Sequence, residues 1–349
     1  MSNEFKSNLV IKMKGKSHSK AMRIIVSGFP KGVKVDDCFI KENLSRRRPT
    51  NNLSNARIEE DKYYFVKGVS DNYTNGKKLV IEVVNNNYHS DQYKKGIVRP
   101  GHVDYPAYVK YQDKYDYRGG GEFSGRLTIL TVILGALAKL ALAENGVNIA
   151  SHIYQIGNIK DEAIDYLNID TKNLATNPNK LKQMEEEILK AKTAGDSLGG
   201  IVEVVASGVK VGLGEAYFGG LESKISSLMF AIPGAKEVSF GEDFDVASTN
   251  GANYNDQIRY VDGKIELLSN NAGGINGGLA NGAPIVVRVK FRPTSSIAKM
   301  QKSIDILKKE NIDLKVEGNH DACFAYRCGV IVEGMLAIAL LDSYLEEDK

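Results

Sequence analysis

The sequence predicts an α+β fold built as one large domain over residues 1–349. Segments with strand-like alternation and segments with helical periodicity are both present, but they do not follow the regular β-α-β-α order of a doubly wound parallel sheet. No internal repeat and no linker rich in proline, glycine and serine divides the chain. Because 42% of the residues are hydrophobic, the chain is able to bury a sizeable core.

Short runs rich in β-branched residues predict the strands. The first two predicted strands flank a turn at Gly15–His18. The Asn75–Gly76 pair predicts a turn between the third and fourth predicted strands. In chain order the predicted strands are Asn8–Lys12, Ile24–Val26, Tyr63–Val69, Lys78–Val84, Val147–Gly157, Ile201–Val211 and Pro284–Phe291.

Helical periodicity and capping residues predict the helices. Pro178 is suited to a first helical turn, and Thr294 or Ser295 is suited to cap a helix. The apolar run Leu127–Ala143 contains Lys139 and is shorter than the ~20 residues that cross a bilayer, so we expect a buried helix there. In chain order the predicted helices are Val35–Leu44, Leu127–Glu144, Asn177–Lys192, Ala216–Ala231, Thr294–Lys309 and Val330–Leu345. Asn85–Lys95 is expected to be a solvated loop, and Arg99–Asp116 shows little periodicity.

Composition narrows the function classes. With 46 basic and 43 acidic residues the net charge is only +3, which disfavours a dedicated nucleic-acid binder. The cysteines, Cys38, Cys323 and Cys328, form no C-x-x-C motif and are expected to be reduced thiols. No apolar run precedes the charges of the N-terminal segment, so we expect a cytoplasmic protein with no membrane partner.

Several chemical motifs are absent or incomplete. There is no G-x-G-x-x-G fingerprint, and Asp71–Lys78 lacks the first glycine and the final Ser/Thr of a P-loop. His320, Cys323 and Cys328 lack a fourth ligand nearby, so no metal is expected. Ser197 lies in a G-x-S-x-G pentapeptide, but a predicted helix precedes it and a strand follows, the reverse of a nucleophile elbow. A serine hydrolase remains an alternative that predicts labelling of Ser197 by a fluorophosphonate.

Histidines and arginines recur in glycine-adjacent turns. The histidine pKa lies near physiological pH, which suits acid-base chemistry, and the guanidinium binds carboxylate or phosphate through two hydrogen bonds. Solvated surface charge is the alternative for any single arginine. The pattern predicts a site for a small polyanionic substrate, and its residues are His18, His102, His320, Arg46, Arg47, Arg48, Arg99, Arg118 and Arg126.

At these residues the chain resembles the chorismate synthase family. The similar segments occur in the family's order along the chain. They are Ser17–His18, Arg46–Pro49, RPGHVDY from Arg99, DYRGGG from Asp116, GDSLGG from Gly195, GLGE from Gly212, NNAGGINGG from Asn270, PIVVRVKFRPTSSI from Pro284 and HDAC from His320. The resemblance implies a β-α-β sandwich and a homotetramer.

The resemblance also implies a reaction. It is the anti 1,4-elimination of phosphate from 5-enolpyruvylshikimate-3-phosphate to give chorismate in the shikimate pathway, with reduced FMN and no net redox change. His18 and His102 would donate protons, and Asp321 would assist proton removal. Arg47, Arg48, Arg99 and Arg126 would bind the substrate. The residues expected to line FMN are Ser124, Gly277, Arg292, Pro293, Thr294, Ser295, Ser296 and Asn319. The family is associated with NADP, but no nicotinamide fingerprint is visible, so a separate flavin reductase is the simpler expectation.

The chain departs from the family's pattern beside the predicted site. The departures are Lys16, Glu122, Phe123, Leu127 and Asn319. A carboxylate about 4 Å from a phosphate costs roughly 4 kcal/mol at an effective dielectric near 20. A homologue with lost or altered activity is therefore the alternative. Because the charge changes at positions 16 and 122 cancel, we expect Lys16 and Glu122 to form an ion pair.

Overall fold

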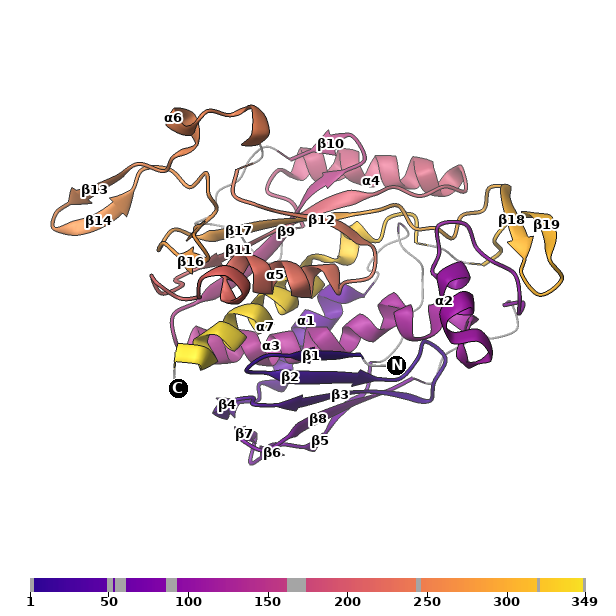
Figure 1. The fold of residues 1–349 in the computed structure, drawn as a ribbon, viewed down its shortest axis with the longest axis horizontal. Helices are drawn as coiled ribbons and strands as arrows, with labels where there is room; N and C mark the ends of the chain where they lie inside the picture. Colours follow the sequence, from indigo (N-terminus) through magenta and orange to yellow (C-terminus); the bar gives the residue numbers. More distant parts are fainter. Residues whose placement is uncertain are drawn as a thin grey trace.

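A computed structural model describes residues 3–48, 53, 61–85, 93–161, 174–242, 246–318 and 321–347. Two five-stranded antiparallel sheets enclose a layer of helices (Figure 1). In order across the first sheet the strands are β1 (Glu4–Lys6), β2 (Val10–Lys14), β3 (Ala21–Ser27), β8 (Leu79–Val84) and β5 (Tyr63–Lys67). In order across the second sheet they are β10 (Ile159–Lys160), β9 (Asn148–Ile156), β11 (Gly200–Ser207), β17 (Ile285–Phe291) and β12 (Ala235–Phe240).

The helices lie mainly between the sheets. The middle layer contains α1 (Asp37–Arg47), α3 (Thr128–Ala143) and α7 (Gly329–Glu347), as Figure 1 shows. The remaining helices are α2 (Asp104–Tyr111), α4 (Pro178–Thr193), α5 (Leu221–Phe230) and α6 (Gly251–Tyr254). The predicted α+β fold and β-α-β sandwich are confirmed.

The remaining strands are short and belong to neither five-stranded sheet. They form one three-stranded sheet and several hairpins. They are β4 (Lys31–Lys34), β6 (Val69–Ser70), β7 (Tyr73–Asn75), β13 (Ile258–Val261), β14 (Lys264–Leu267), β15 (Ile275–Asn276), β16 (Leu279–Ala280), β18 (Gln301–Asp305) and β19 (Glu310–Leu314).

Helices α3 and α7 are apolar around most of their circumference because they are enclosed on both sides. Where they cross, a β-carbon on Gly135 would lie 2.2 Å from the α-carbon of Gly334, so the two backbones meet only because glycine is present. One hydrophobic core runs through both sheets and these helices, which supports the expectation of a single domain. Among the described residues the segment Arg118–Ala143 is long and apolar enough to span a membrane, but most of it is buried inside the molecule.

Most predicted elements are confirmed, with boundaries shifted by a few residues. The predicted helix Thr294–Lys309 is wrong: the chain forms a loop through Ser296 and then strand β18, which pairs with β19. Long-range bonds hold this loop, since the Thr294 hydroxyl donates to the Asp321 carbonyl at 2.5 Å. The helix predicted from Ala216 begins only at Leu221. Helix α2 lies in a segment for which no helix was predicted.

Candidate active site

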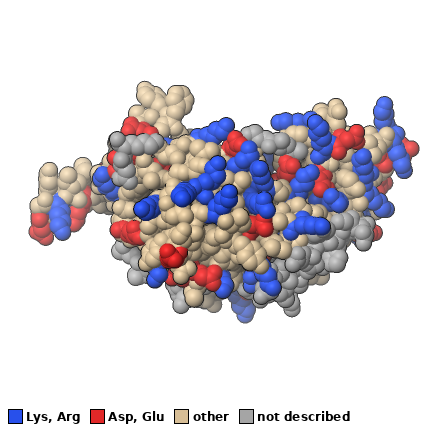
Figure 2. Space-filling model, turned by 90° about the horizontal axis from the view of Figure 1, so that it is seen from below, with Lys and Arg blue, Asp and Glu red and all other residues tan. Residues whose placement is uncertain are grey.

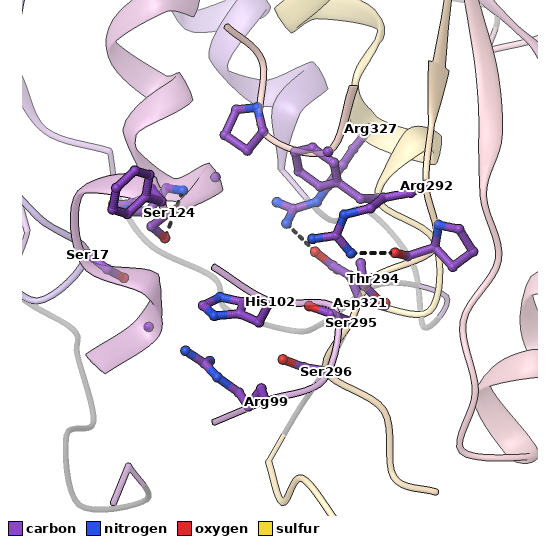
Figure 3. A pocket seen from close by; sticks show the side chains of 18 of the residues that line it. Ser17, Arg99, His102, Ser124, Arg292, Thr294, Ser295, Ser296, Asp321 and Arg327 are labelled. Carbon is purple, nitrogen blue, oxygen red and sulfur yellow. Dashed lines mark hydrogen bonds and ion pairs between the residues drawn. The ribbon is translucent and has the colours of Figure 1, made fainter. Parts of the chain in front are cut away.

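A cavity of about 370 Å³ opens between the turn after β2, helix α1, the segment around α2, and the loops after β17 and before α7. The segments that line it are distant in the sequence, and Figure 3 shows their side chains around one space. The predicted residues that line it are His18, Arg47, Arg48, Arg99, His102, Ser124, Arg126, Arg292, Pro293, Thr294, Ser295, Ser296 and Asp321. The structure therefore brings together most of the site that the sequence predicts.

Asp104, the first residue of α2, organises the wall that carries Arg99 and His102. Its carboxylate is buried and accepts two hydrogen bonds from the Arg99 side chain, at 2.7 and 2.9 Å. The Tyr115 hydroxyl donates to the same carboxylate at 2.7 Å, and His102 Nδ1 lies 2.9 Å from it. This carboxylate thus fixes one guanidinium and one imidazole beside each other at the cavity edge.

Burial and neighbouring charges determine the protonation states of Asp104 and His102. Burial opposes the charged form of Asp104, but hydrogen bonds with Arg99 and His102 outweigh it and hold the pKa of Asp104 well below its usual range. Burial lowers the pKa of His102, and the charges of Arg99 and Arg292 lower it further while Asp104 acts in the opposite direction. The lowered pKa favours the neutral imidazole form of His102 near pH 7.

His18 lies across the glycine-rich segment from His102. Its ring makes an edge contact with Tyr93 at 5.4 Å, and Arg99 lies over the same tyrosine ring. Gly119 has a φ of +56°, and a β-carbon there would lie 2.9 Å from His18 Nε2. A β-carbon on Gly120 would lie 3.3 Å from His102 Nε2. The glycines thus let the backbone pass close to both imidazoles.

Two further arginines meet on the carboxylate of Asp61. Arg126 donates to Asp61 at 2.9 Å, and Arg48 donates at 3.2 Å. Arg47 is buried and donates to the Thr128 hydroxyl at 3.2 Å and to the Arg126 carbonyl at 3.3 Å. Because one buried carboxylate serves two guanidiniums, positive charge remains in excess here, which suits a polyanionic ligand.

Loops from the C-terminal half form the opposite wall. Arg327 forms an ion pair with Asp321, and its guanidinium lies over the Phe324 ring at 5.4 Å. In Figure 3, Arg292, Thr294 and Asp321 lie across the space from Ser17 and Ser124. This wall presents serine hydroxyls and guanidiniums toward the cavity.

The altered residues Lys16 and Glu122 lie outside this cavity. They line a second, neighbouring cavity, whereas the adjacent residues Ser17 and Phe123 line the first. Lys16 Nζ lies 4.0 Å from Glu122 Oε1, so the expected ion pair is confirmed at the limit of salt-bridge distance. Glu122 is therefore not among the residues that line the first cavity.

Some candidate residues are not part of the cavity. Gly277 lies in the turn between β15 and β16 and does not line it. Arg46 pairs with buried Glu333, and Arg118 pairs with Asp116. The Ser197 hydroxyl donates to the Thr294 carbonyl at 2.7 Å, and α4 precedes it while β11 follows, as predicted. Asn319 and His320 lie outside the described residues, while Cys323 and Cys328 are buried.

Sequence reasoning missed several residues that shape the cavity. They are Asp61, Tyr93, Asp104, Phe324 and Arg327. Asp104 was predictable from sequence, because it lies two residues after His102 in the Pro100–Gly101–His102 turn. Asp61 contacts Arg48 and Arg126, which are distant from it in the sequence, so no local pattern marks it.

Comparisons with known proteins agree with this geometry. The family model described as chorismate synthase matches residues 9–345. Chorismate synthase of Korarchaeum cryptofilum is 39% identical over 94% of this chain and 93% of the relative. That of Pyrococcus abyssi is 38% identical over 95% of this chain and 94% of the relative. A solved structure titled "Crystal Structure of Chorismate Synthase" has a TM-score of 0.74 and 27% identity, over 97% of this chain and 92% of that one. On these grounds the chain belongs to the chorismate synthase family.

Proposed function

We propose that the chain is an active chorismate synthase, a carbon–oxygen lyase that eliminates phosphate from 5-enolpyruvylshikimate-3-phosphate with reduced FMN. The observation that carries the proposal is the cavity in which two histidines, six arginines and Asp321 meet. The excess of guanidinium groups suits a substrate with one phosphate and two carboxylates.

The arginines bind and orient the substrate in this proposal. Arg48 and Arg126, both fixed by Asp61, form one anion site, and Arg99, fixed by Asp104, forms another. Because these guanidiniums are held before binding, little side-chain entropy is lost when the anion arrives.

His102 supplies a proton where the phosphate leaves. An anionic group beside His102 raises the pKa of its imidazole, so the neutral ring takes up a proton as the substrate binds. The protonated ring then stabilises the leaving phosphate and donates to it. His18 holds the second proton-donating position, and Asp321 assists removal of the ring proton.

Reduced FMN fits the wall formed by the C-terminal loops. The Nε atom of Arg327 is buried there and has no hydrogen-bond partner within the part of the chain that the structure describes. The hydroxyls of Ser124, Ser295 and Ser296 surround the same space (Figure 3). These donors suit a phosphate and the polar edge of a flavin ring. When bound, reduced FMN would lend electron density to the substrate as phosphate leaves, with no net redox change.

The test is an anaerobic assay with chemically reduced FMN and 5-enolpyruvylshikimate-3-phosphate, following chorismate and released phosphate. We expect turnover by the unmodified chain. Arg126→Ala should abolish it, whereas Arg118→Ala, which removes an arginine that does not line the cavity, should retain it.

Absence of turnover from folded protein would contradict the proposal. Binding of reduced FMN, measured in the same cuvette, would then indicate the alternative, a family member with lost or altered activity. Lys16 and Glu122 line a separate cavity, which favours an active enzyme over that alternative. The proposal includes a homotetramer and a link to NADP, as the resemblance implies. It also includes a cytoplasmic location and a separate flavin reductase, as expected from the composition and from the missing nicotinamide fingerprint.

A further inference from the structure

The chain doubles back after helix α2, so that Tyr115 meets the residue at which that helix begins. Gln112 ends the helix with φ +49° and ψ −127°, a backbone conformation that residues other than glycine rarely adopt. The Tyr115 N–H donates to the Gln112 carbonyl at 3.1 Å, which closes the turn. The Tyr115 hydroxyl donates to Asp104 at 2.7 Å. A strained turn therefore places a hydroxyl on the carboxylate that also holds Arg99 and His102.

The Tyr115 hydroxyl acts on Asp104 as a donor that keeps its proton. Burial raises the pKa of Tyr115 well above its ordinary value, and the hydrogen bond to Asp104 raises it further. The ring lies in a small buried apolar cluster, where it meets the Tyr108 ring edge-on at 5.1 Å. The Tyr108 hydroxyl instead accepts from the Gly96 N–H at 2.8 Å. Two buried tyrosines thus lie side by side, and of their two hydroxyls it is that of Tyr115 that binds the carboxylate.

The two oxygens of Asp104 meet different numbers of donors. Oδ2 accepts from Nε and from the backbone N–H of Arg99, at 2.7 and 3.0 Å. Oδ1 accepts from Arg99 Nη2 at 2.9 Å and from the Tyr115 hydroxyl at 2.7 Å, and His102 Nδ1 lies 2.9 Å from the same oxygen. A carboxylate oxygen offers about two lone pairs, so three donors compete for them. The His102 contact is the least well directed, since its buried Nδ1 has no well-aligned acceptor among the described residues.

We propose that Tyr115 is a positioning residue that weakens the contact between Asp104 and His102, because its hydroxyl occupies the carboxylate oxygen that faces the imidazole. Without this hydroxyl, a lone pair of Oδ1 becomes available to the Nδ1–H of His102. The carboxylate then binds the imidazole more tightly and favours its protonated form. The hydroxyl therefore makes protonation of His102 depend more strongly on a second anion, such as the phosphate of the proposed substrate.

The charges around His102 make this one contact important. Among the described residues, the charged groups that act on His102 are Asp104, Arg99 and Arg292. Burial and the two guanidiniums lower the pKa of His102, whereas Asp104 raises it. Arg99 and His102 lie beside each other at the cavity (Figure 3), but Tyr115 is not among the described residues that line it. Tyr115 therefore acts on the imidazole only through the carboxylate.

This inference rests on the proposed function, since it concerns the residue that donates a proton to the leaving phosphate. Its first test uses the full chain without substrate or flavin, so that failure of the proposed reaction and failure of this inference are distinguishable. NMR follows the Cε1–H resonance of His102 against pH in the unmodified chain and in Tyr115→Phe. The matched control is Tyr108→Phe, which removes the neighbouring buried hydroxyl and leaves the donors to Asp104 in place. We expect the pKa of His102 to rise in Tyr115→Phe and to stay unchanged in Tyr108→Phe.

A fall in the pKa of His102 in Tyr115→Phe would overturn the proposal, because it would show that the hydroxyl only holds Asp104 in place. An unchanged pKa, or equal shifts in the two variants, would overturn it as well.

The pH profile of kcat/KM in the anaerobic assay gives a second readout. An acid that must be protonated loses activity as the pH rises through its pKa, so the alkaline limb should move to higher pH in Tyr115→Phe. The limb should stay in place in Tyr108→Phe, and a limb that moves to lower pH in Tyr115→Phe would contradict the proposal. Circular dichroism checks folding, and Tyr115→Met, which also lacks the hydroxyl, replaces Tyr115→Phe if that variant does not fold.

Discussion

Two buried carboxylates, Asp61 and Asp104, determine how the cavity presents its positive charge. Each is buried and holds side chains that line the cavity, Arg48 and Arg126 in one case and Arg99 and His102 in the other. Neither carboxylate needs to contact the substrate to control where these groups point. Positioning residues of this kind are expected to affect turnover nearly as strongly as the groups that they hold.

Asp61→Asn tests this role. We expect kcat/KM to fall about 100-fold, because two guanidiniums lose their shared anchor and a displacement of ~1 Å at a reacting centre is costly. Steady-state kinetics measure the change. The matched control is Asp116→Asn, which breaks the Asp116–Arg118 pair outside the cavity and should leave kcat/KM within about twofold. Equal losses in both variants would show that Asp61 has no special positioning role.

The protonation of His102 should depend on ligand. In the free protein its pKa lies below the ordinary 6.5, so the ring is neutral at pH 7. Saturating inorganic phosphate should raise this pKa, because the anion stabilises the imidazolium. NMR titration of the His102 Cε1–H resonance measures both values.

Asp104→Asn provides the control for this titration. Since Asp104 opposes the lowering of the His102 pKa, its removal should move the free-protein value further down. The resonance of His152, buried in the second sheet beside Glu203, should not respond to phosphate. A His102 signal that phosphate leaves unmoved would argue against its contact with the leaving group.

The glycine beside His18 gives another residue-scale prediction. Gly119→Ala should lower kcat by at least tenfold, because the new β-carbon would displace the His18 ring, 2.9 Å away. Gly146→Ala is the control: its φ is +77°, so it has a similar backbone cost of ~1–2 kcal/mol, but a β-carbon there meets nothing within 4 Å. Comparing kcat at matched folded fractions separates displacement of the histidine from backbone strain. Similar kcat values in the two variants would contradict the argument.

At the scale of elements, the middle helices are joined by a buried charge. Glu333 of α7 accepts hydrogen bonds from Arg46 of α1 at 2.8 Å and from Lys139 of α3 at 2.8 Å. The Ser151 hydroxyl of β9 donates to it at 2.7 Å. The lysine that interrupts the apolar run of α3 therefore has a partner inside the core. Burial opposes ionisation of Glu333, but Lys139 and Arg46 outweigh it and lower its pKa to about 2.

Glu333→Gln should lower the free energy of unfolding by about 3 kcal/mol at pH 7, because two partly buried cations lose their buried counter-charge. The folded pKa is depressed, so this stabilisation is present above the ordinary value of 4.5 and is lost as the pH falls toward about 2. Urea unfolding at pH 7, 4.5 and 3 should therefore show the two proteins converging on acidification. Asp313→Asn, which breaks the exposed pair with Lys302, should show no such convergence.

The sequence predicts elements well where local periodicity and burial agree. The apolar helices Thr128–Ala143 and Gly329–Glu347 and the strand Ile285–Phe291 are in this class. The helix predicted over Thr294–Lys309 failed because distant groups hold that segment, including the Asp321 carbonyl that binds Thr294. The isolated hairpins were also missed because their strands are short. The hairpin of β13 and β14 does carry a strong turn signal, since only Asp262 and Gly263 separate its two strands.

At the site, too, local sequence patterns predict some features and tertiary contacts determine the others. Resemblance to the family identified the histidines and most of the arginines, but it did not say what holds them. Asp61 was missed because its partners, Arg48 and Arg126, come from separate parts of the chain. Contacts of this kind are determined by tertiary packing, and no local pattern in one sequence reveals them.

At the scale of the whole molecule, the small net charge hides a local concentration of positive charge in the cavity. The chain carries only +3, yet the cavity gathers six arginines from both halves. On the face seen in Figure 2, basic side chains are also more frequent than acidic ones. A cleft lined by one sign of charge raises the association rate of an oppositely charged ligand.

This field predicts a dependence on salt. We expect kcat/KM for the polyanionic substrate to fall about tenfold between low and physiological ionic strength, because screening shortens the reach of the arginines to ~8 Å. The value of kcat should change little. Steady-state kinetics over a range of potassium chloride concentrations measure both, and an uncharged osmolyte at matched osmolarity is the control. A kcat/KM that does not vary with salt would contradict attraction by the cavity.

The separation of Glu122 from Phe123 into two cavities has a consequence for judging divergent enzymes. A residue-by-residue comparison with the family's motif counts both departures equally. Only Phe123 lines the first cavity, however, because Glu122 lines the second. Changes at positions 16 and 122 leave the lining of the first cavity unaltered, whereas a change at position 123 alters it. The number of departures from the family's motifs therefore overstates the change at the candidate site unless each departure is assigned to the cavity that its residue lines.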